Sequence, residues 1–199
     1  MGSDPVSAAL IALLLGLVQG ATEFLPISSS AHLYAIPYLF GISDPLLSSL
    51  AFGAVIHLGT LAAVLVALRS DVTRLTRVAL RTLTSLGRHR GDSSDERLII
   101  AIVIGTIPAV LLGLTAGDVL ESAVRTPLVV AAAVTAGALL LWFAERVGSR
   151  ERPLQSVGVI DGLMVGLAQA LALIPGISRS GATISGGLLL GFRREAAAR

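Results

Sequence analysis

Residues 16–32 read GLVQGATEFLPISSSAH, and they close an apolar stretch that begins near the start of the chain. A proline and a run of serines interrupt the helix that such a stretch would otherwise form. Residues 175–183, PGISRSGAT, interrupt a second apolar stretch in a similar way. Non-helical backbone at membrane depth is tolerated only inside protein or beside a water-filled cavity. Both segments therefore predict re-entrant helical hairpins, over residues 5–42 and 157–192.

The composition of the whole chain supports a membrane setting. Of 199 residues, 54% are hydrophobic and 14% are charged, whereas soluble domains carry about 25% charged residues. Mean hydropathy is +0.83, so we predict an all-α polytopic membrane protein with a single transmembrane domain. The absence of cysteine excludes disulfides and thiolate metal sites. The net charge of +2 gives no indication of a nucleic-acid partner, and none is expected.

Three further runs without Asp, Glu or Arg are long enough to cross a bilayer: residues 46–68, 98–117 (after Arg97) and 126–144. A signal peptide is the alternative reading of the first apolar stretch. It fits poorly, because no basic residue precedes that stretch.

Arginines are concentrated in a predicted loop over residues 69–97, with seven of them against four acidic residues. The positive-inside rule places this loop in the cytoplasm, together with residues 145–153 and 193–199. The short loop 118–125 would then lie outside. In this topology the first hairpin enters the membrane from outside and the second from inside.

The two hairpins align when the chain is offset by 150 residues. The matches are Gly16-Leu17-x-Gln19 with Gly166-Leu167-x-Gln169, and Ile27-Ser28-x-Ser30 with Ile177-Ser178-x-Ser180. Three intervening crossings give the copies opposite orientation, which predicts an inverted-topology repeat with its broken helices near the midplane. The second copy stops soon after its hairpin, so we expect the C-terminal helices of the repeat to be missing from this sequence.

Two charged residues, Glu23 and Arg179, fall inside these apolar segments. A charge at the bilayer centre costs at least about 2.5–3.5 kcal/mol, so such residues are functional by default. Opposite hairpins of an inverted repeat would bring the pair together. The alternative interpretation is a structural ion pair that locks the hairpins. His57, in the first crossing, is interpreted as an interhelical hydrogen-bonding residue, and a cavity-lining role is the alternative.

The polar residues around these charges favour phosphate binding. Helix N-termini and arginine side chains both bind phosphate oxygens well, and a serine beside a histidine is the minimum for nucleophilic catalysis. The predicted binding residues are Gln19, Ser28, Ser30, Gly176, Ser178, Ser180, Gly181 and Thr183.

The first motif, Gly16–His32, and the second, Pro175–Thr183, resemble those of the undecaprenyl-diphosphate phosphatase family, the bacitracin-resistance membrane phosphatases. The resemblance also includes residues 104–113, IGTIPAVLLG. It implies an enzyme that converts a C55 polyprenyl diphosphate to the monophosphate carrier lipid used in cell-wall assembly. It further implies a plasma-membrane site that faces outward. The family's catalytic residues fall on Glu23, Ser29, His32 and Arg179.

One departure from the family concerns metal binding. The first motif of the family usually has two glutamates four residues apart, but here Gln19 takes the place of the first. Glu23 is therefore the one carboxylate available to Mg²⁺ or Ca²⁺, which makes metal dependence doubtful for this chain. The substitution also leaves the polyprenyl chain length open. No organic cofactor is expected.

Several mechanistic alternatives stay open at this stage. Ser29 attacks the terminal phosphorus or orients a water that does so, and either His32 or Glu23 serves as the base. A polyprenyl-phosphate flippase is the competing function, because inverted repeats with broken helices are typical of transporters. The expected partners are the polyprenyl diphosphate substrate and membrane lipids, and a homo-oligomer is left open.

Overall fold

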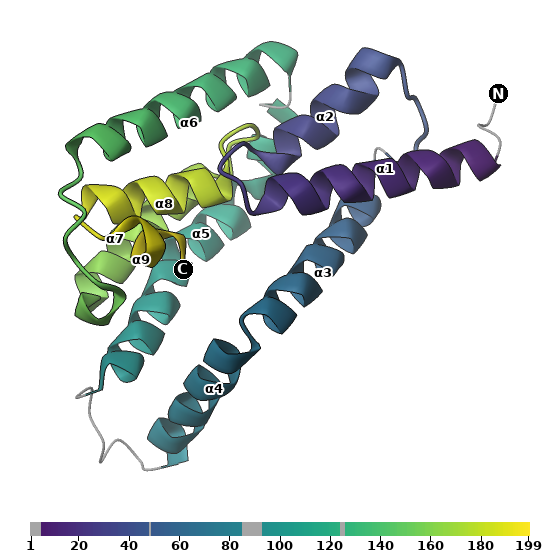
Figure 1. The fold of residues 1–199 in the computed structure, drawn as a ribbon. Helices are drawn as coiled ribbons and strands as arrows, with labels where there is room; N and C mark the ends of the chain where they lie inside the picture. Colours follow the sequence, from purple (N-terminus) through teal and green to yellow (C-terminus); the bar gives the residue numbers. More distant parts are fainter. Residues whose placement is uncertain (1–4, 48, 85–92, 124–125) are drawn as a thin grey trace.

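The computed structural model describes residues 5–47, 49–84, 93–123 and 126–199, and all of its regular elements are helices (Figure 1). The prediction of an all-α chain is confirmed for this part of the sequence. The helices are α1 Pro5–Glu23, α2 Ser29–Phe40, α3 Leu50–Ala67, α4 Arg69–Thr84, α5 Ser94–Ala123, α6 Pro127–Val147, η1 Leu154–Ser156, α7 Val159–Leu171, α8 Arg179–Leu189 and α9 Arg194–Ala198.

Three of the described helices, α1, α5 and α6, are long and apolar enough to cross a membrane. The number rises to four if α3 and α4, which meet at an angle of 81°, count as one bent span. The predicted run at 98–117 lies within α5, and the run at 126–144 lies within α6 except for Thr126, which caps that helix. The run predicted at 46–68 forms α3, which meets the criterion only together with α4.

Two predicted loops are helical over most of their length. Residues 69–84 of the arginine-rich segment form α4, because its apolar residues recur at helical spacing between the arginines. Arg88 and Arg90 of that segment lie outside the described residues. The prediction of a loop over 118–125 is wrong for residues 118–123, which belong to α5, and residues 124 and 125 lie outside the described residues.

Close contact of helix backbones holds α7 against α5. A Cβ atom added to Gly162 would lie 2.3 Å from the carbonyl oxygen of Ala101, and one added to Gly166 would lie 2.1 Å from that of Gly105. These distances are too short for any side chain, so the glycines allow the two helices to approach. Small residues serve this purpose at helix interfaces in membranes. The contact fixes the first half of the second hairpin.

Arg152 joins the two ends of the second hairpin that lie away from its turn. Its guanidinium donates two hydrogen bonds to the Asp161 carboxylate, at 2.8 and 2.7 Å, and one to the Leu190 carbonyl at 3.0 Å. The bond to Asp161 raises the pKa of the Arg152 guanidinium above its ordinary value. This two-pronged contact joins the start of α7 to the end of α8.

Candidate active site

The first hairpin turns between α1 and α2 at Ser28. Its side chain accepts a hydrogen bond from the Ala31 backbone N–H at 3.3 Å and so caps α2. Ser28 adopts φ +65°, a left-handed conformation uncommon for a residue with a side chain. Its hydroxyl also lies 3.2 Å from that of Ser30, and its carbonyl contacts Nδ1 of His32 at 2.8 Å. The turn is thus held by its own polar groups.

The carboxylate of Glu23, at the end of α1, collects the polar contacts of this turn. Its Oε2 atom accepts hydrogen bonds from Ser29 Oγ at 2.6 Å and from Gln19 Nε2 at 2.8 Å. Gln19 is fully buried, and its Oε1 is the one buried side-chain atom without a hydrogen-bond partner in the described part of the chain. A serine hydroxyl that donates to a carboxylate is the arrangement that activates a nucleophile.

His57 on α3 also faces this carboxylate, with Nε2 3.7 Å from Glu23 Oε2. Its other ring nitrogen, Nδ1, lies 2.7 Å from the Gly53 carbonyl, one helical turn away. Sequence patterns alone do not place His57 in the site, because it is the one ionisable residue in an apolar helix. The available signal was a polar side chain in an apolar helix. Two interpretations followed from it: an interhelical contact or a residue that lines the cavity. Both agree with the position of His57 beside Glu23.

The second hairpin turns between α7 and α8 and repeats the first turn 150 residues later. Ser178 caps α8 by accepting a hydrogen bond from the Gly181 N–H at 3.1 Å. Its hydroxyl lies 3.1 Å from that of Ser180. Gly176, with φ +106°, lets the turn pass beside α6, where an added Cβ would lie 2.7 Å from the Val130 carbonyl oxygen. Thr183 donates to the Arg179 carbonyl at 3.0 Å.

The two turns meet directly. Ser180 Oγ donates a hydrogen bond of 3.0 Å to the Leu25 carbonyl, although the two residues are 155 positions apart in sequence. Figure 1 shows the turn after α1 beside the turn that precedes α8. The predicted approach of the two motifs is therefore present in the structure.

Glu23 and Arg179 do not pair in the structure. The prediction that they come together is therefore wrong, and so is the alternative that they form a structural ion pair. Glu23 is occupied by its own hairpin and by α3. Arg179, an exposed residue at the start of α8, makes no side-chain hydrogen bond or ion pair with the described residues. Its guanidinium remains available to an anion at the place where the two turns meet.

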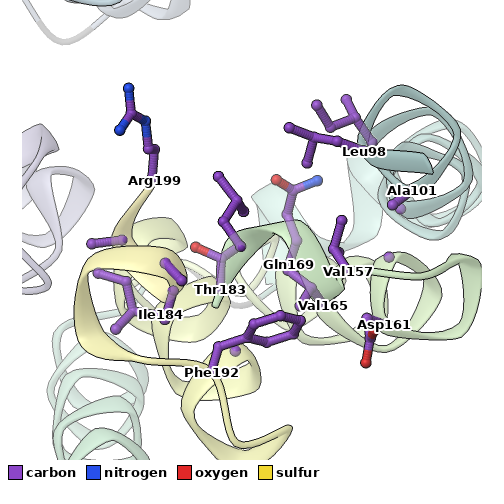
Figure 2. Close-up of a pocket in the computed structure, with 18 of the residues that line it drawn as sticks. Leu98, Ala101, Val157, Asp161, Val165, Gln169, Thr183, Ile184, Phe192 and Arg199 are labelled. Atoms are coloured by element: carbon purple, nitrogen blue, oxygen red, sulfur yellow. The ribbon is translucent and has the colours of Figure 1, made fainter. Parts of the chain in front are cut away.

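A cavity of about 610 Å³ opens beside these turns, and Glu23, Ser180 and Thr183 are among its lining residues. Its other walls come from α4, α5, α7, α8 and α9, and they are mostly apolar. Figure 2 shows the Gln169 and Thr183 side chains directed into this space, with Leu98 and Val165 among its apolar neighbours. Charged side chains also line it, at Asp71, Arg74, Asp161 and Arg199, and a mainly apolar space with a few polar groups suits an amphiphilic ligand.

The side chains near Glu23 do not form a metal cage. In the described residues no three His, Asp or Glu side chains come together at a spacing suited to a metal ion. Gln19 turns its N–H toward Glu23, so the amide acts there as a donor, and only its buried Oε1 remains as an oxygen ligand. Ca²⁺ takes six to eight oxygen ligands, many more than this pair offers.

Apolar helices of membrane-spanning length, with a polar site where two broken hairpins meet, define a polytopic helical membrane protein. Residues 12–199 match the family described as bacitracin resistance protein BacA, and the chain belongs to this family. An undecaprenyl-diphosphatase of a Nocardioides species is 47% identical over 96% of this chain and 68% of its own length. The undecaprenyl-diphosphatase of Moorella thermoacetica is 45% identical over 96% and 69% of the two chains. That of a Synechococcus species is 49% identical over 94% and 66%. The chain thus spans about two thirds of the length of these relatives.

Proposed function

We propose that the protein hydrolyses undecaprenyl diphosphate to the monophosphate carrier lipid and inorganic phosphate, in support of cell-envelope glycan assembly and bacitracin resistance. The hydrogen bond from Ser29 to Glu23 is the observation that carries this proposal. It pairs a hydroxyl nucleophile with a base at the turn that the family motif marks. The diphosphatase relatives give the substrate.

The diphosphate binds where the two turns meet, and the cavity between α5, α7 and α8 takes the first isoprene units. Arg179 supports this placement because its guanidinium is exposed and unpaired among the described residues. The backbone N–H groups at the starts of α2 and α8 face the same region and favour phosphate. Both groups stabilise the charge that develops on the phosphoryl oxygens in the transition state.

The reaction begins with attack of Ser29 Oγ on the terminal phosphorus. The Ser29 proton passes to Glu23 Oε2, and Glu23 gives it to the bridging oxygen as the bond from phosphorus to that oxygen breaks and the lipid monophosphate leaves. Glu23, ionised again, then accepts a proton from the water molecule that attacks the phosphoserine, and it returns this proton to Ser29 Oγ as inorganic phosphate leaves. Glu23 is favoured over His32 as the base because Ser29 already donates to it, whereas His32 Nδ1 contacts the Ser28 carbonyl. No step passes through a metal ion.

For the membrane arrangement we propose the inverted repeat predicted from the sequence. Hairpins 5–42 and 157–192 enter from opposite faces, residues 69–97 lie on the cytoplasmic side, and the site opens to the outer side. The matched caps of Ser28 and Ser178, 150 residues apart, support the repeat. The contact between Ser180 and Leu25 supports hairpins that meet at depth.

Phosphate release from C55 polyprenyl diphosphate in detergent tests the proposal. We compare the wild-type protein with Glu23→Gln and His32→Gln, each in EDTA and with added Mg²⁺. Removal of a general base lowers kcat about 10²–10⁴-fold, so Glu23→Gln should lose far more activity than His32→Gln. A larger loss for His32→Gln would reassign the base. A folded wild-type protein that moves polyprenyl phosphate across vesicles without releasing phosphate would establish the flippase instead.

A further inference from the structure

Helix α4 has a basic side and, next to it, an apolar side. Its sequence, RSDVTRLTRVALRTLT, holds four arginines and one aspartate. Arg74, Arg77 and Arg81 recur at spacings of three and four residues, so they share one side of the helix. Leu80 and Leu83 lie on the neighbouring side with 56% and 75% of their surface exposed. The arginine side and the leucine side are therefore both open.

The carboxylates near α4 form their ion pairs and hydrogen bonds with residues other than Arg77 and Arg81. Asp71 pairs with Arg74 and Arg199, and Asp95 pairs with Arg74. Glu96 accepts a hydrogen bond from Thr82. Among the described residues, no acceptor or carboxylate contacts the guanidinium groups of Arg77 and Arg81. Their charge is left for a partner outside the protein.

The direction of α4 shows which partner fits. The chain bends by 81° between α3 and α4, so α4 runs almost perpendicular to the apolar helix before it. If α3 crosses the bilayer, α4 lies along the membrane surface, where arginines meet headgroups and leucines reach the acyl chains. A helix with these two sides in this orientation is typical of interfacial membrane binding.

We infer that α4 is a lipid-binding surface: Arg77 and Arg81 bind anionic phospholipid headgroups while Leu80 and Leu83 enter the acyl region. Charge complementarity selects anionic over zwitterionic lipid. Each arginine near an anionic surface strengthens binding by about five-fold at moderate salt, and added salt screens the effect. The inference goes beyond the proposed function and does not depend on which reaction the protein catalyses.

A single labelled cysteine tests this inference cleanly, because the chain contains no cysteine. Leu83→Cys, and separately Ser70→Cys on the arginine side, carry an environment-sensitive fluorophore in the full chain. The protein is placed in nanodiscs of phosphatidylcholine with increasing phosphatidylglycerol. We expect lipid-borne nitroxide to quench the label at position 83, and aqueous iodide to quench the label at position 70. Quenching at 83 should rise with the phosphatidylglycerol content.

Charge variants then assign the effect to the arginines. With the label at position 83, Arg81→Gln should weaken the binding of α4 to anionic lipid about five-fold, and half-maximal quenching should therefore move to a higher phosphatidylglycerol fraction. Arg77→Gln with Arg81→Gln should remove the dependence, and Arg77→Lys with Arg81→Lys should retain it. Equal quenching by iodide at positions 70 and 83, or an unchanged midpoint in the double glutamine variant, would overturn the inference.

Discussion

The two hairpin turns share one scaffold but differ in the side chains placed on it. In each, the first serine caps the following helix and contacts the serine two positions later, at 3.2 Å in the first turn and 3.1 Å in the second. Ser29 stands in the first turn where Arg179 stands in the second. The serine is bonded to Glu23, whereas the arginine is unpaired among the described residues. The comparison indicates that the two turns share their geometry. In the proposed function, the one residue that differs in each turn separates the chemistry, at Ser29, from the phosphate binding, at Arg179.

Ser29→Ala should have the largest effect, because it removes the proposed nucleophile from the first turn. Loss of a nucleophilic serine costs about 10⁴-fold or more in kcat, measured as phosphate release. Ser30→Ala is the matched comparison in the same turn: Ser30 is predicted to bind substrate rather than to attack it, and its hydroxyl contacts only Ser28 among the described residues, so this variant should lose much less activity. A loss of only about ten-fold for Ser29→Ala would instead indicate that a water molecule attacks directly.

Arg179→Ala should be the next most severe change, because it removes the cation of the second turn. We expect kcat/KM to fall about 100-fold or more, the cost of losing a strong transition-state contact. Arg193→Ala, an exposed arginine beyond the end of α8, serves as the control. Near-normal turnover of the Arg179 variant would show that the second turn does not bind the phosphates, and the division between the turns would fail.

His57→Leu tests whether the first turn needs support from α3. His57 Nε2 lies 3.7 Å from Glu23 Oε2, beyond hydrogen-bonding distance, so we expect a modest loss of kcat, of at most about ten-fold. His57→Gln retains a polar side chain of similar reach and should recover part of the activity. If both variants have wild-type kcat in the phosphate-release assay, His57 only lines the site.

The main features of the fold and of the site could be predicted because they rest on local patterns. Apolar length predicted α5 and α6, and the matched serine motifs predicted that the two turns would correspond. The partners of individual side chains could not be predicted, because they depend on how whole helices pack. Glu23 contacts His57 on α3 rather than Arg179, and no spacing in the sequence encodes the position of α3 against α1. The helix at 69–84 was missed since its arginines were interpreted as loop residues.

Ser180→Ala should have the smallest effect, and it isolates the contact between the turns. The variant loses the hydrogen bond to the Leu25 carbonyl, worth about 1 kcal/mol of the free energy of unfolding. It also loses the contact with Ser178, but Ser30→Ala loses the equivalent contact with Ser28 in the first turn. The difference between the two variants in thermal unfolding therefore measures the contact that joins the hairpins. Equal stability of the two would mean that this bond does not hold the turns together, and that the packing of α5 on α7 positions Arg179 by itself.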